Sequence, residues 1–410
     1  MDLPKGIWVF VGLFLLAIAV FGGIEWMNGR EENVNLVGPK SIVTNWTDDP
    51  KTSIAITWHT KNAEDASIVQ LVKEEGTVSF EGEQVIQAEG KTSTIEIDNG
   101  TQQGVHKVVV DGLEPGTTYH YRVGNGSADG WSETYSFTTE AENVEEFSFI
   151  NVTDSQGVTK QDFALWGKTL NKAFEMFPDA KFIVHNGDLT EEPTKEAGWD
   201  YFFEEAKQWI TSVPLMPVTG NHDEVKEDAA RFVSHFQVPD NGTAEATPGT
   251  SYSFDYGSAH IVVLNTESNV KKQAKWLEED LANTSQPWKI VAMHEGPYGG
   301  NQKESILKRW VPIFDAYGVD LVLQGHNHEY VRSYPMKNDQ IVEEGEGTVY
   351  VVPNTSGPKF NVKKEDLYYH QVHFQNEKQM FAAIHISGNT LTYEAYDVDG
   401  NKLDELTLQH

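Results

Sequence analysis

The sequence contains no cysteine among its 410 residues. Neither a disulfide bond nor a thiolate metal site can therefore form. A chain of this length is expected to fold into two or three domains, each with its own core. The absence of cysteine is compatible with an exported protein but does not require one.

Positive charge is also scarce. Lysine and arginine number 31 against 62 aspartate and glutamate residues, which gives a formal net charge of −31. A field this negative disfavours nonspecific binding to nucleic acid, and no basic patch interrupts it, so no nucleic-acid partner is expected. The same field slows the approach of anionic substrates unless metal ions create a local positive hole. The sequence indicates no particular oligomeric state.

One long apolar run lies near the N-terminus. Ile7 to Ile24 carries no charge over 18 residues, with Lys5 before it and Glu25 after it. Its length falls between a signal-peptide core and a full membrane span. We favour an uncleaved signal anchor that forms an apolar helix, with a cleaved signal peptide as the alternative, within residues 1–37. Either interpretation places the rest of the chain outside the cytoplasm, anchored to the cell membrane or secreted.

Short alternating segments then fill residues 38–143. They are TSIAITWHT, ASIVQLV, STIEIDN, VHKVVVDGL, TYHYRVG and TYSFTT, separated by turn residues. This pattern predicts an all-β sandwich. Trp58 early in the segment and LEPGTTYHYRV later resemble a fibronectin type III module. Residues 144–410 are expected to form a separate catalytic domain.

In residues 144–410, polar motifs repeatedly follow short apolar runs. FSFINV precedes Asp154, KFIVHNG precedes Asp188, VPLMPVTG precedes Asn221, WKIVAM precedes His294, and VDLVLQG precedes His326 and His328. Such runs are typical of buried strands, and ligands of α/β sheets gather at the carboxyl ends of strands. Helices are expected at 161–177, 196–211, 270–281 and 305–317. The strands after residue 348 are expected to complete the second of two sheets and form a final hairpin.

The six side chains suit a pair of metal ions. Asp188 is the expected bridging ligand, because a carboxylate can bind two cations. Asp154 and His328 would complete the first site, and Asn221, His294 and His326 the second. His326 and His328 lie two apart, so in an extended segment both imidazoles would face the same side. The metals could be Fe, Mn or Zn.

A metal pair can make hydroxide available near neutral pH and clamp the oxygens of an in-line displacement. The sequence therefore predicts attack on phosphorus by a metal-bridging hydroxide. His222 is the expected catalytic side chain, because imidazole can protonate a leaving alkoxide. Asp223 or another acceptor would fix the tautomer of His222. His185, which precedes the Asp188 motif, is interpreted as a structural histidine.

Together these motifs resemble the calcineurin-like metallophosphoesterase superfamily, whose pattern is D-x-H/G, GDxx, GNH, a single His and GHxH. The resemblance covers roughly residues 145–356. The preceding fibronectin-like segment makes the chain similar to purple acid phosphatases. The resemblance implies an α/β fold with a two-sheet sandwich flanked by helices, a dinuclear metal centre and hydrolysis of phosphate esters.

The sequence departs from purple acid phosphatases at three places. Glu191 replaces the tyrosine whose charge transfer to ferric iron gives the colour, so no purple centre is expected. Gln156 stands where the superfamily often has His or Gly; Gln156 and Glu191 are expected either to bind metal or to orient its ligands. The loop from Glu295 to Ser305 lacks the histidine pair of the plant enzymes. Tyr298, Asn301 and Lys303 are expected to contact phosphate instead.

The resemblance to acid phosphatases favours a phosphomonoester substrate. A phosphodiesterase or nucleotide hydrolase is the alternative within the same chemistry. An alternative of another class is a surface-anchored binding protein in which the metal domain is only structural.

Overall fold

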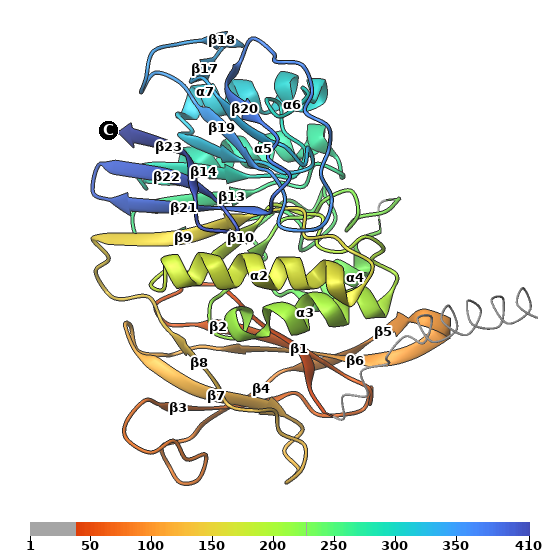
Figure 1. Ribbon diagram of the computed structural model, residues 1–410. Coiled ribbons are helices and arrows are strands. Elements are labelled where there is room, and N and C mark those ends of the chain that lie inside the picture. The colour runs from red at the N-terminus through yellow and green to blue at the C-terminus, as the bar shows by residue number, and fades with distance from the viewer. Residues whose placement is uncertain (1–37, 227) are drawn as a thin grey trace, which may run out of the picture. The chain divides into compact units, whose positions relative to one another are not determined.

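The computed structural model describes residues 38–410 except residue 227. The expected apolar helix over Ile7–Ile24 lies outside these residues. Within the described part of the chain, no helix is both long and apolar enough to cross a membrane. The order of the helices and strands is shown in Figure 1.

The predicted β-sandwich consists of two antiparallel four-stranded sheets. The first contains, in spatial order, β1 (Lys40–Asn45), β2 (Ile54–Thr60), β6 (Thr101–Val110) and β5 (Lys91–Ile97), with a short 3₁₀ turn at Asp98–Gly100. The second contains β4 (Ile86–Glu89), β3 (Ile68–Lys73), β7 (Thr118–Gly124) and β8 (Tyr135–Thr138). Alternation places Trp58 in the core, where it is fully buried and stacks on His106 at 5.1 Å between ring centroids.

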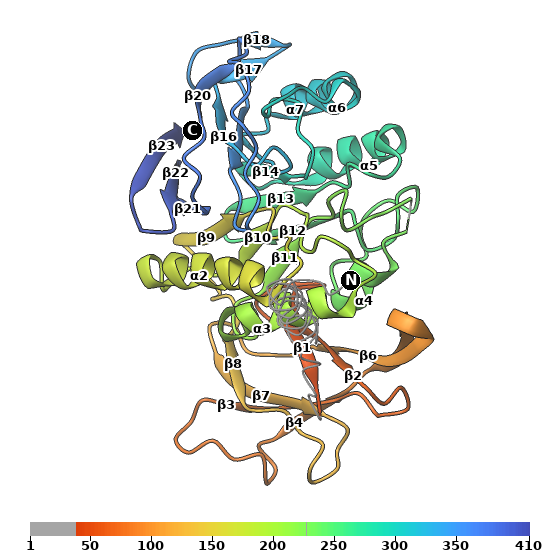
Figure 2. The ribbon, with the colours of Figure 1, turned by 45° about the vertical axis from the view of Figure 1, so that its right-hand side comes forward.

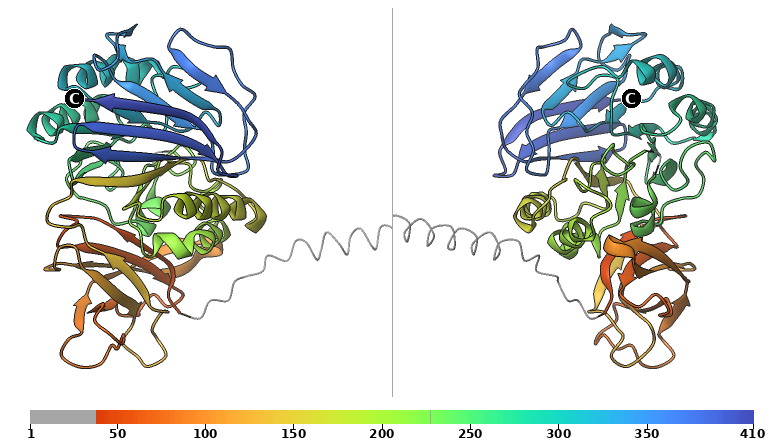
Figure 3. Two further views of the ribbon diagram at one scale, coloured as in Figure 1. Left: turned by 60° about the vertical axis from the view of Figure 1, so that its left-hand side comes forward. Right: turned by 90° about the vertical axis from the view of Figure 1, so that its right-hand side faces the viewer.

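The rest of the chain contains two larger sheets. The six-stranded sheet has the order β11 (Leu215–Pro217), β10 (Ile183–His185), β9 (Glu146–Val152), β21 (Met380–Ser387), β22 (Thr390–Asp397) and β23 (Lys402–Gln409). β9, β10 and β11 are parallel, and β21 returns antiparallel beside β9. Figure 3 shows β21, β22 and β23 as a broad antiparallel ribbon at the edge of this sheet.

The seven-stranded sheet has the order β12 (Tyr252–Tyr256), β13 (Ala259–Val263), β14 (Trp288–Ala292), β15 (Leu321–Leu323), β19 (Val349–Pro353), β16 (Tyr330–Ser333) and β20 (His370–Phe374). A small hairpin, β17 (Met336–Lys337) and β18 (Gln340–Ile341), projects beside it. The expectation that the C-terminal strands all complete the second sheet is wrong. β19 and β20 do, but β21, β22 and β23 extend the first sheet, because β21 pairs with β9 along six residues.

Helices cover the outer faces of both sheets. α2 (Lys160–Met176) and α3 (Glu196–Ile210) lie side by side, with α2 against the six-stranded sheet; α4 (Ala230–His235) is a short helix. α5 (Val270–Asn283), α6 (Glu304–Arg309) and α7 (Val311–Tyr317) pack on the far face of the seven-stranded sheet (Figure 2). The predicted helix over 305–317 is therefore two helices, which meet at Trp310. Proline in the first turn of α7 is compatible with a helix start but not with a continuous helix.

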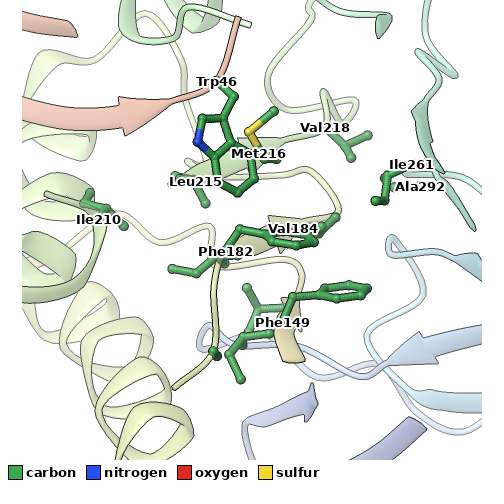
Figure 4. Packing of buried hydrophobic residues seen from close by; sticks show 14 of the residues in the cluster. Trp46, Phe149, Phe182, Val184, Ile210, Leu215, Met216, Val218, Ile261 and Ala292 are labelled. Carbon is green, nitrogen blue, oxygen red and sulfur yellow. The ribbon is translucent and has the colours of Figure 1, made fainter. Parts of the chain in front are cut away.

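The inner faces of the two sheets bury a continuous apolar core (Figure 4). Phe149 and Phe182 stack at 4.6 Å, and Trp46 packs edge-on against Phe182 at 5.5 Å. Ile261 and Ala292 contribute from the seven-stranded sheet. Burying each large side chain stabilises the fold by about 1.5–3 kcal/mol. This packing fixes the strand ends that carry the polar motifs.

Ionic contacts join the β-sandwich to the helices. Lys40 in β1 lies 2.6 Å from a carboxylate oxygen of Glu196 and 2.6 Å from one of Asp200, both in α3. Arg231 in α4 pairs with the other oxygen of Glu196. The Tyr121 hydroxyl in β7 donates to the carbonyl of Thr211 at 2.7 Å. The sandwich and the two-sheet region therefore pack as one unit.

Candidate metal centre

The six predicted ligand residues follow the carboxyl ends of strands from both large sheets. Asp154 follows β9, Asp188 follows β10, Asn221 follows β11, His294 follows β14, and His326 and His328 follow β15. Parallel pairing within each sheet brings these ends to one edge. The convergence predicted from the sequence is thus present in the fold.

Four of these residues have left-handed backbone conformations. The φ angles are 53° at Asp154, 55° at Asp188, 71° at His326 and 50° at His328. Each such residue costs about 1–3 kcal/mol, and such strain concentrates at functional sites. The expectation of an extended His326–His328 segment is wrong, because both residues turn sharply after β15. The two imidazoles reach the site through that turn rather than through strand alternation.

One group of potential metal donors contains Asp154, Asp188 and His328, whose ligand atoms lie within 4.8 Å of one another. Nε2 of His328 is 3.4 Å from Oδ1 of Asp154. The Asp154 carboxylate also accepts a hydrogen bond of 2.7 Å from the Thr153 hydroxyl and one of 3.0 Å from the peptide N–H of His326. All three donor side chains are buried.

A second group contains Asp188, His294 and His326. Nε2 of His294 lies 3.2 Å from Oδ2 of Asp188 and 3.2 Å from Oδ1 of Asn221. Nδ1 of His326 lies 2.9 Å from the same Asn221 oxygen. Asp188 is common to both groups, which is the position that a bridging carboxylate would take.

Main-chain carbonyls fix the tautomers of two of these histidines. Nδ1 of His294 is 2.8 Å from the carbonyl of Asn186, and Nδ1 of His328 is 3.1 Å from the carbonyl of Lys359. A carbonyl only accepts, so Nδ1 must carry the proton in each ring. When the ring is neutral, the lone pair therefore lies on Nε2, which faces the carboxylates. Metal-binding histidines are usually held in this way.

Glycine is required where the strand ends approach one another. Gly187 has a φ of +95°, and a Cβ there would lie 2.7 Å from Nδ1 of His294. A Cβ on Gly220 would lie 2.2 Å from Oδ1 of Asp188. Any larger residue at either position would displace a predicted ligand.

His222 lies beside this group of donors. Its peptide N–H donates to Oδ1 of Asp188 at 2.8 Å, and its Nδ1 donates to the carbonyl of Glu191 at 2.9 Å. Asp223 does not hold the ring: its carboxylate accepts the peptide N–H groups of Asp188 at 2.7 Å and Gly220 at 2.9 Å. The acceptor that fixes the His222 tautomer is thus the Glu191 carbonyl, and Asp223 supports the loops that carry the ligands.

The side chains of the centre are strongly coupled. Burial disfavours charge on His294, but the Asp188 carboxylate outweighs this effect and raises the pKa of His294 to about 10. Burial disfavours charge on Asp188 as well, and the nearby His294 outweighs it, so the pKa of Asp188 lies below its usual range. Burial, together with the His294 charge, lowers the pKa of His326 to about 3. A buried carboxylate that stays ionised as readily as Asp188 is suited to binding cations, whereas burial raises the pKa of Asp154.

The other predicted residues differ in position. Gln156 is buried, with Nε2 3.3 Å from Oδ2 of Asp188, and its Oε1 has no hydrogen-bond partner among the described residues. Glu191 pairs with Lys359 and lies 3.8 Å from Nδ1 of His222. Lys303 pairs with Glu295, a carboxylate 3.9 Å from Nε2 of His326.

Two residues of the expected phosphate-binding set point elsewhere. Tyr298 is fully buried in the core beneath α6 and α7, and its hydroxyl donates to Asp339 at 2.9 Å. The side-chain oxygen of Asn301 accepts a hydrogen bond from Lys364. The structure therefore brings Lys303, but not Tyr298, towards the group of donors. Tyr298 lies in a turn between β14 and α6, at a buried position that the sequence alone does not reveal.

Glu295 and Lys359 were not predicted. Glu295 directly follows His294, which is the only signal that the sequence offers for it. Lys359 approaches Glu191 across 168 residues of sequence, so no local pattern could have indicated the contact.

The donor set fits two metal ions. Two carboxylates, three imidazoles and an amide oxygen supply borderline and hard ligands in numbers that two divalent cations need, and cysteine is absent. The unpartnered Oε1 of Gln156, buried next to Asp188, adds a neutral oxygen that a cation could satisfy. Asp154, Asp188 and His328 would hold one ion, and Asp188, Asn221, His294 and His326 the other.

Comparisons with known proteins support the same interpretation. Residues 39–139 match the purple acid phosphatase N-terminal domain, and residues 148–330 match the calcineurin-like phosphoesterase family. A phosphoenolpyruvate phosphatase of Allium cepa is 28% identical over 302 residues, which cover 67% of this chain and 59% of the onion protein. Acid phosphatase type 7 of Mus musculus is 27% identical over 383 residues, which cover 85% of this chain and 81% of the mouse protein.

The fold also has a solved counterpart. A purple acid phosphatase from yellow lupin (Lupinus luteus) seeds superimposes with a TM-score of 0.79 at 19% identity, over 92% of this chain and 75% of the lupin chain. The expected α/β fold with an N-terminal β-domain is thereby confirmed. The chain spans less than two thirds of the onion relative's own length, at 59%.

Proposed function

We propose that this chain, which matches the purple acid phosphatase N-terminal domain over residues 39–139 and the calcineurin-like phosphoesterase family over residues 148–330, hydrolyses phosphate monoesters. The observation that carries the proposal is the pair of donor groups that share Asp188 at the carboxyl ends of both large sheets. Two ions bound there would activate water and neutralise phosphate charge.

The residues of the chain have separate tasks in this proposal. Asn221 bridges the second group of donors through Oδ1, which lies 3.2 Å from His294 and 2.9 Å from His326. The peptide N–H of His222 holds Asp188 in place. The hydrogen bonds of Asp223 keep the loops after β10 and β11 at a fixed distance. These hydrogen bonds hold the ligands in fixed positions, which lowers the cost of binding an ion.

His222 is proposed as the group that protonates the leaving oxygen. Its Nδ1 is engaged by the Glu191 carbonyl, so Nε2 is the ring nitrogen left to face substrate. The side chain is 30% exposed, which gives a substrate access to it. A protonated imidazole in this position can transfer a proton to an alkoxide.

Lysines near the centre would offset the negative field of the chain. Lys303 and Lys359 each pair with a carboxylate next to the centre, Glu295 and Glu191 respectively. Their side chains are 41% and 40% exposed. Both could turn towards an incoming phosphate dianion, and this supports an anionic ester as substrate.

The decisive experiment compares wild type with Asn221→Ala on a chromogenic phosphomonoester and on a phosphodiester, each with added Fe, Mn or Zn. We expect metal-dependent turnover of the monoester that falls by about 100-fold or more in the variant. Asn376→Ala, at a loop position after β20, is the matched control. Faster turnover of the diester would show that the chain is a phosphodiesterase rather than a phosphomonoesterase. Metal binding without any turnover would favour a binding protein.

We also propose the domain division 38–143 and 144–410 and a location outside the cytoplasm. The first is supported by the family matches, which end at residue 139 and begin again at residue 148. The second is supported by the apolar sequence Ile7–Ile24 alone. Fractionation of cells that produce the full chain, with and without residues 1–37, tests whether this segment holds the protein at the membrane.

A further inference from the structure

A cavity that the proposed phosphoesterase chemistry does not use lies between the β-sandwich and the two-sheet region. Its volume is about 720 Å³, which is within the range typical of small-molecule sites. The sandwich contributes residues 47–51 and Glu140, and the two-sheet region contributes residues 239–241, part of β12 and His260 in β13. None of the six proposed metal ligands lines it. Ligand sites form preferentially between domains in this way.

The lining of the cavity is strongly acidic. Five carboxylates face only two cationic side chains, those of Lys51 and His260; the carboxylates belong to Asp48, Asp49, Glu140, Asp240 and Asp255. His260 pairs with Asp255 and with Asp280, so its charge is already neutralised within the wall. The other four carboxylates form no ion pair within the described part of the chain. The cavity therefore carries an excess of negative charge that a cationic ligand would offset.

Glu140 is the carboxylate that points most directly to a ligand. The residue is only 4% exposed. Its Oε1 accepts the peptide N–H of Gly257 at 2.7 Å, whereas its Oε2 has no hydrogen-bond partner among the described residues. Burial raises the pKa of Glu140 to about 6, which the Gly257 hydrogen bond and Lys51 offset only in part. A buried carboxylate with a free oxygen costs free energy unless a positive group pairs with it.

The spread of the charges favours an extended organic cation over a single metal ion. A metal ion needs several donors close together, and the compact donor groups found among the described residues include none of these carboxylates. Part of the lining is also apolar, because Pro50, Pro239 and Phe254 line the same cavity. Methylene groups can lie on apolar surface while the charged ends of the same molecule reach carboxylates.

We propose that this cavity binds a linear aliphatic diamine, with one ammonium group on Oε2 of Glu140 and the other between Asp48 and Asp240. Both aspartates are exposed, so they can receive the second ammonium group at the rim. An ammonium group donates up to three hydrogen bonds, and those to carboxylates are among the strongest. A bound diamine would also hold the sandwich against the two-sheet region. Binding here needs neither a metal ion nor a phosphate ester, so it is independent of the proposed function.

Isothermal titration calorimetry of the full chain with cadaverine tests the site. An ionic strength of about 0.15 M screens the attraction of any cation to the acidic surface. We expect one cadaverine per chain in wild type, and an affinity lower by about 10-fold or more in Glu140→Gln, because a hydrogen bond between charged groups is lost. Glutamine keeps an acceptor for the Gly257 N–H. Asp240→Asn should also weaken binding, and this exposed side chain makes no hydrogen bond within the described residues that its loss would break.

Glu204→Gln, on the exposed face of α3, removes the same charge outside the cavity and is the matched control. Pentylamine, which has the same methylene chain but one ammonium group, should bind more weakly than cadaverine. Cadaverine should also raise the melting temperature of wild type by more than that of Glu140→Gln. Equal affinity of cadaverine for wild type, Glu140→Gln and Asp240→Asn would overturn the proposal. Binding of Ca²⁺ that Glu140→Gln abolishes, without any binding of cadaverine, would overturn it as well.

Discussion

Nε2 of His294 and Oδ2 of Asp188 lie 3.2 Å apart, although the two residues follow strands of different sheets. The packing of the two sheets therefore sets the spacing of the centre directly. Small changes in the core between the sheets would move the two halves of the ligand set relative to one another.

Because Asp188 belongs to both donor groups, its substitution should affect both ions. Asp188→Asn keeps the size of the side chain and removes its charge. We expect both metals of the centre to bind more weakly and kcat/KM to fall by about 100-fold or more. Metal content by elemental analysis and turnover of a chromogenic monoester are the measurements. An Asp188→Asn protein with both ions and full activity would contradict the shared position.

If His222 protonates the leaving oxygen, its importance should depend on the leaving group. His222→Ala should lower kcat by about 10²- to 10⁴-fold for an alkyl phosphate. The loss should be much smaller for a nitrophenyl phosphate, whose leaving group needs no proton. Metal content should stay unchanged. Equal losses for both esters would instead assign His222 to binding or orientation.

Iron bound at this centre should give no purple colour. Glu191 replaces the tyrosine that carries the charge transfer in purple acid phosphatases, and no cysteine can substitute for it. The visible spectrum of the ferric protein is therefore expected to lack a charge-transfer band. Glu191→Tyr should introduce one if the side chain at this position reaches the ion, and its spectrum checks that directly.

The contact between Lys40, Glu196 and Arg231 should make the fold sensitive to acid. Burial of Glu196 favours protonation, but the two positive side chains outweigh it and lower the pKa from 4.5 to about 2. The stabilisation is present above pH 4.5 and is lost as the pH falls towards 2. Glu196→Gln should cost about 3–5 kcal/mol at neutral pH, because it leaves buried charges without their partner.

Denaturant unfolding of Glu196→Gln and wild type between pH 3 and 7 measures this effect. The difference in unfolding free energy should shrink as the pH is lowered. Glu204→Gln, on the exposed face of α3, is the matched control. A difference that stays constant with pH would rule out the ionic origin.

His260 should have the opposite pH dependence. Its burial lowers the pKa, but hydrogen bonds of 2.6 Å to Asp255 and 2.8 Å to Asp280 outweigh this effect and raise the pKa from 6.5 to about 9. The stabilisation is complete below pH 6.5 and disappears as the pH rises through 9. Thermal melts of wild type and His260→Gln should differ most at pH 6 and converge near pH 10. Melting temperatures that converge at low pH instead would contradict the raised pKa of His260.

The sequence predicts the parts of the centre that depend on strand ends. Apolar runs locate β9, β10, β14 and β15, and parallel pairing brings the residues that follow them together. It does not predict the positive φ angles of His326 and His328, because this turn makes its contacts, such as the His326 N–H bond to Asp154, with residues far away in the sequence. The burial of Tyr298 depends on the packing of α6 and α7, which no local sequence pattern indicates.

His370 and His373 show the same limit. They are three residues apart in β20, a spacing that argues against a shared face, and the register shift between them brings their rings together. Glu329 next to His328 resembles any charged residue that follows a motif. Contacts made through backbone geometry, or across long stretches of sequence, leave no local pattern.

The hydrogen bond from Nδ1 of His222 is accepted by the main-chain carbonyl of Glu191 rather than by the Glu191 carboxylate. Every amino acid carries that carbonyl, so substitution at position 191 cannot abolish the acceptor. The tyrosine of the purple enzymes can therefore be replaced at this position without removing the acceptor that holds the His222 imidazole. A substitution at position 191 can therefore change the absorption spectrum of a bound metal while the hydrogen bond that orients His222 for proton transfer is kept.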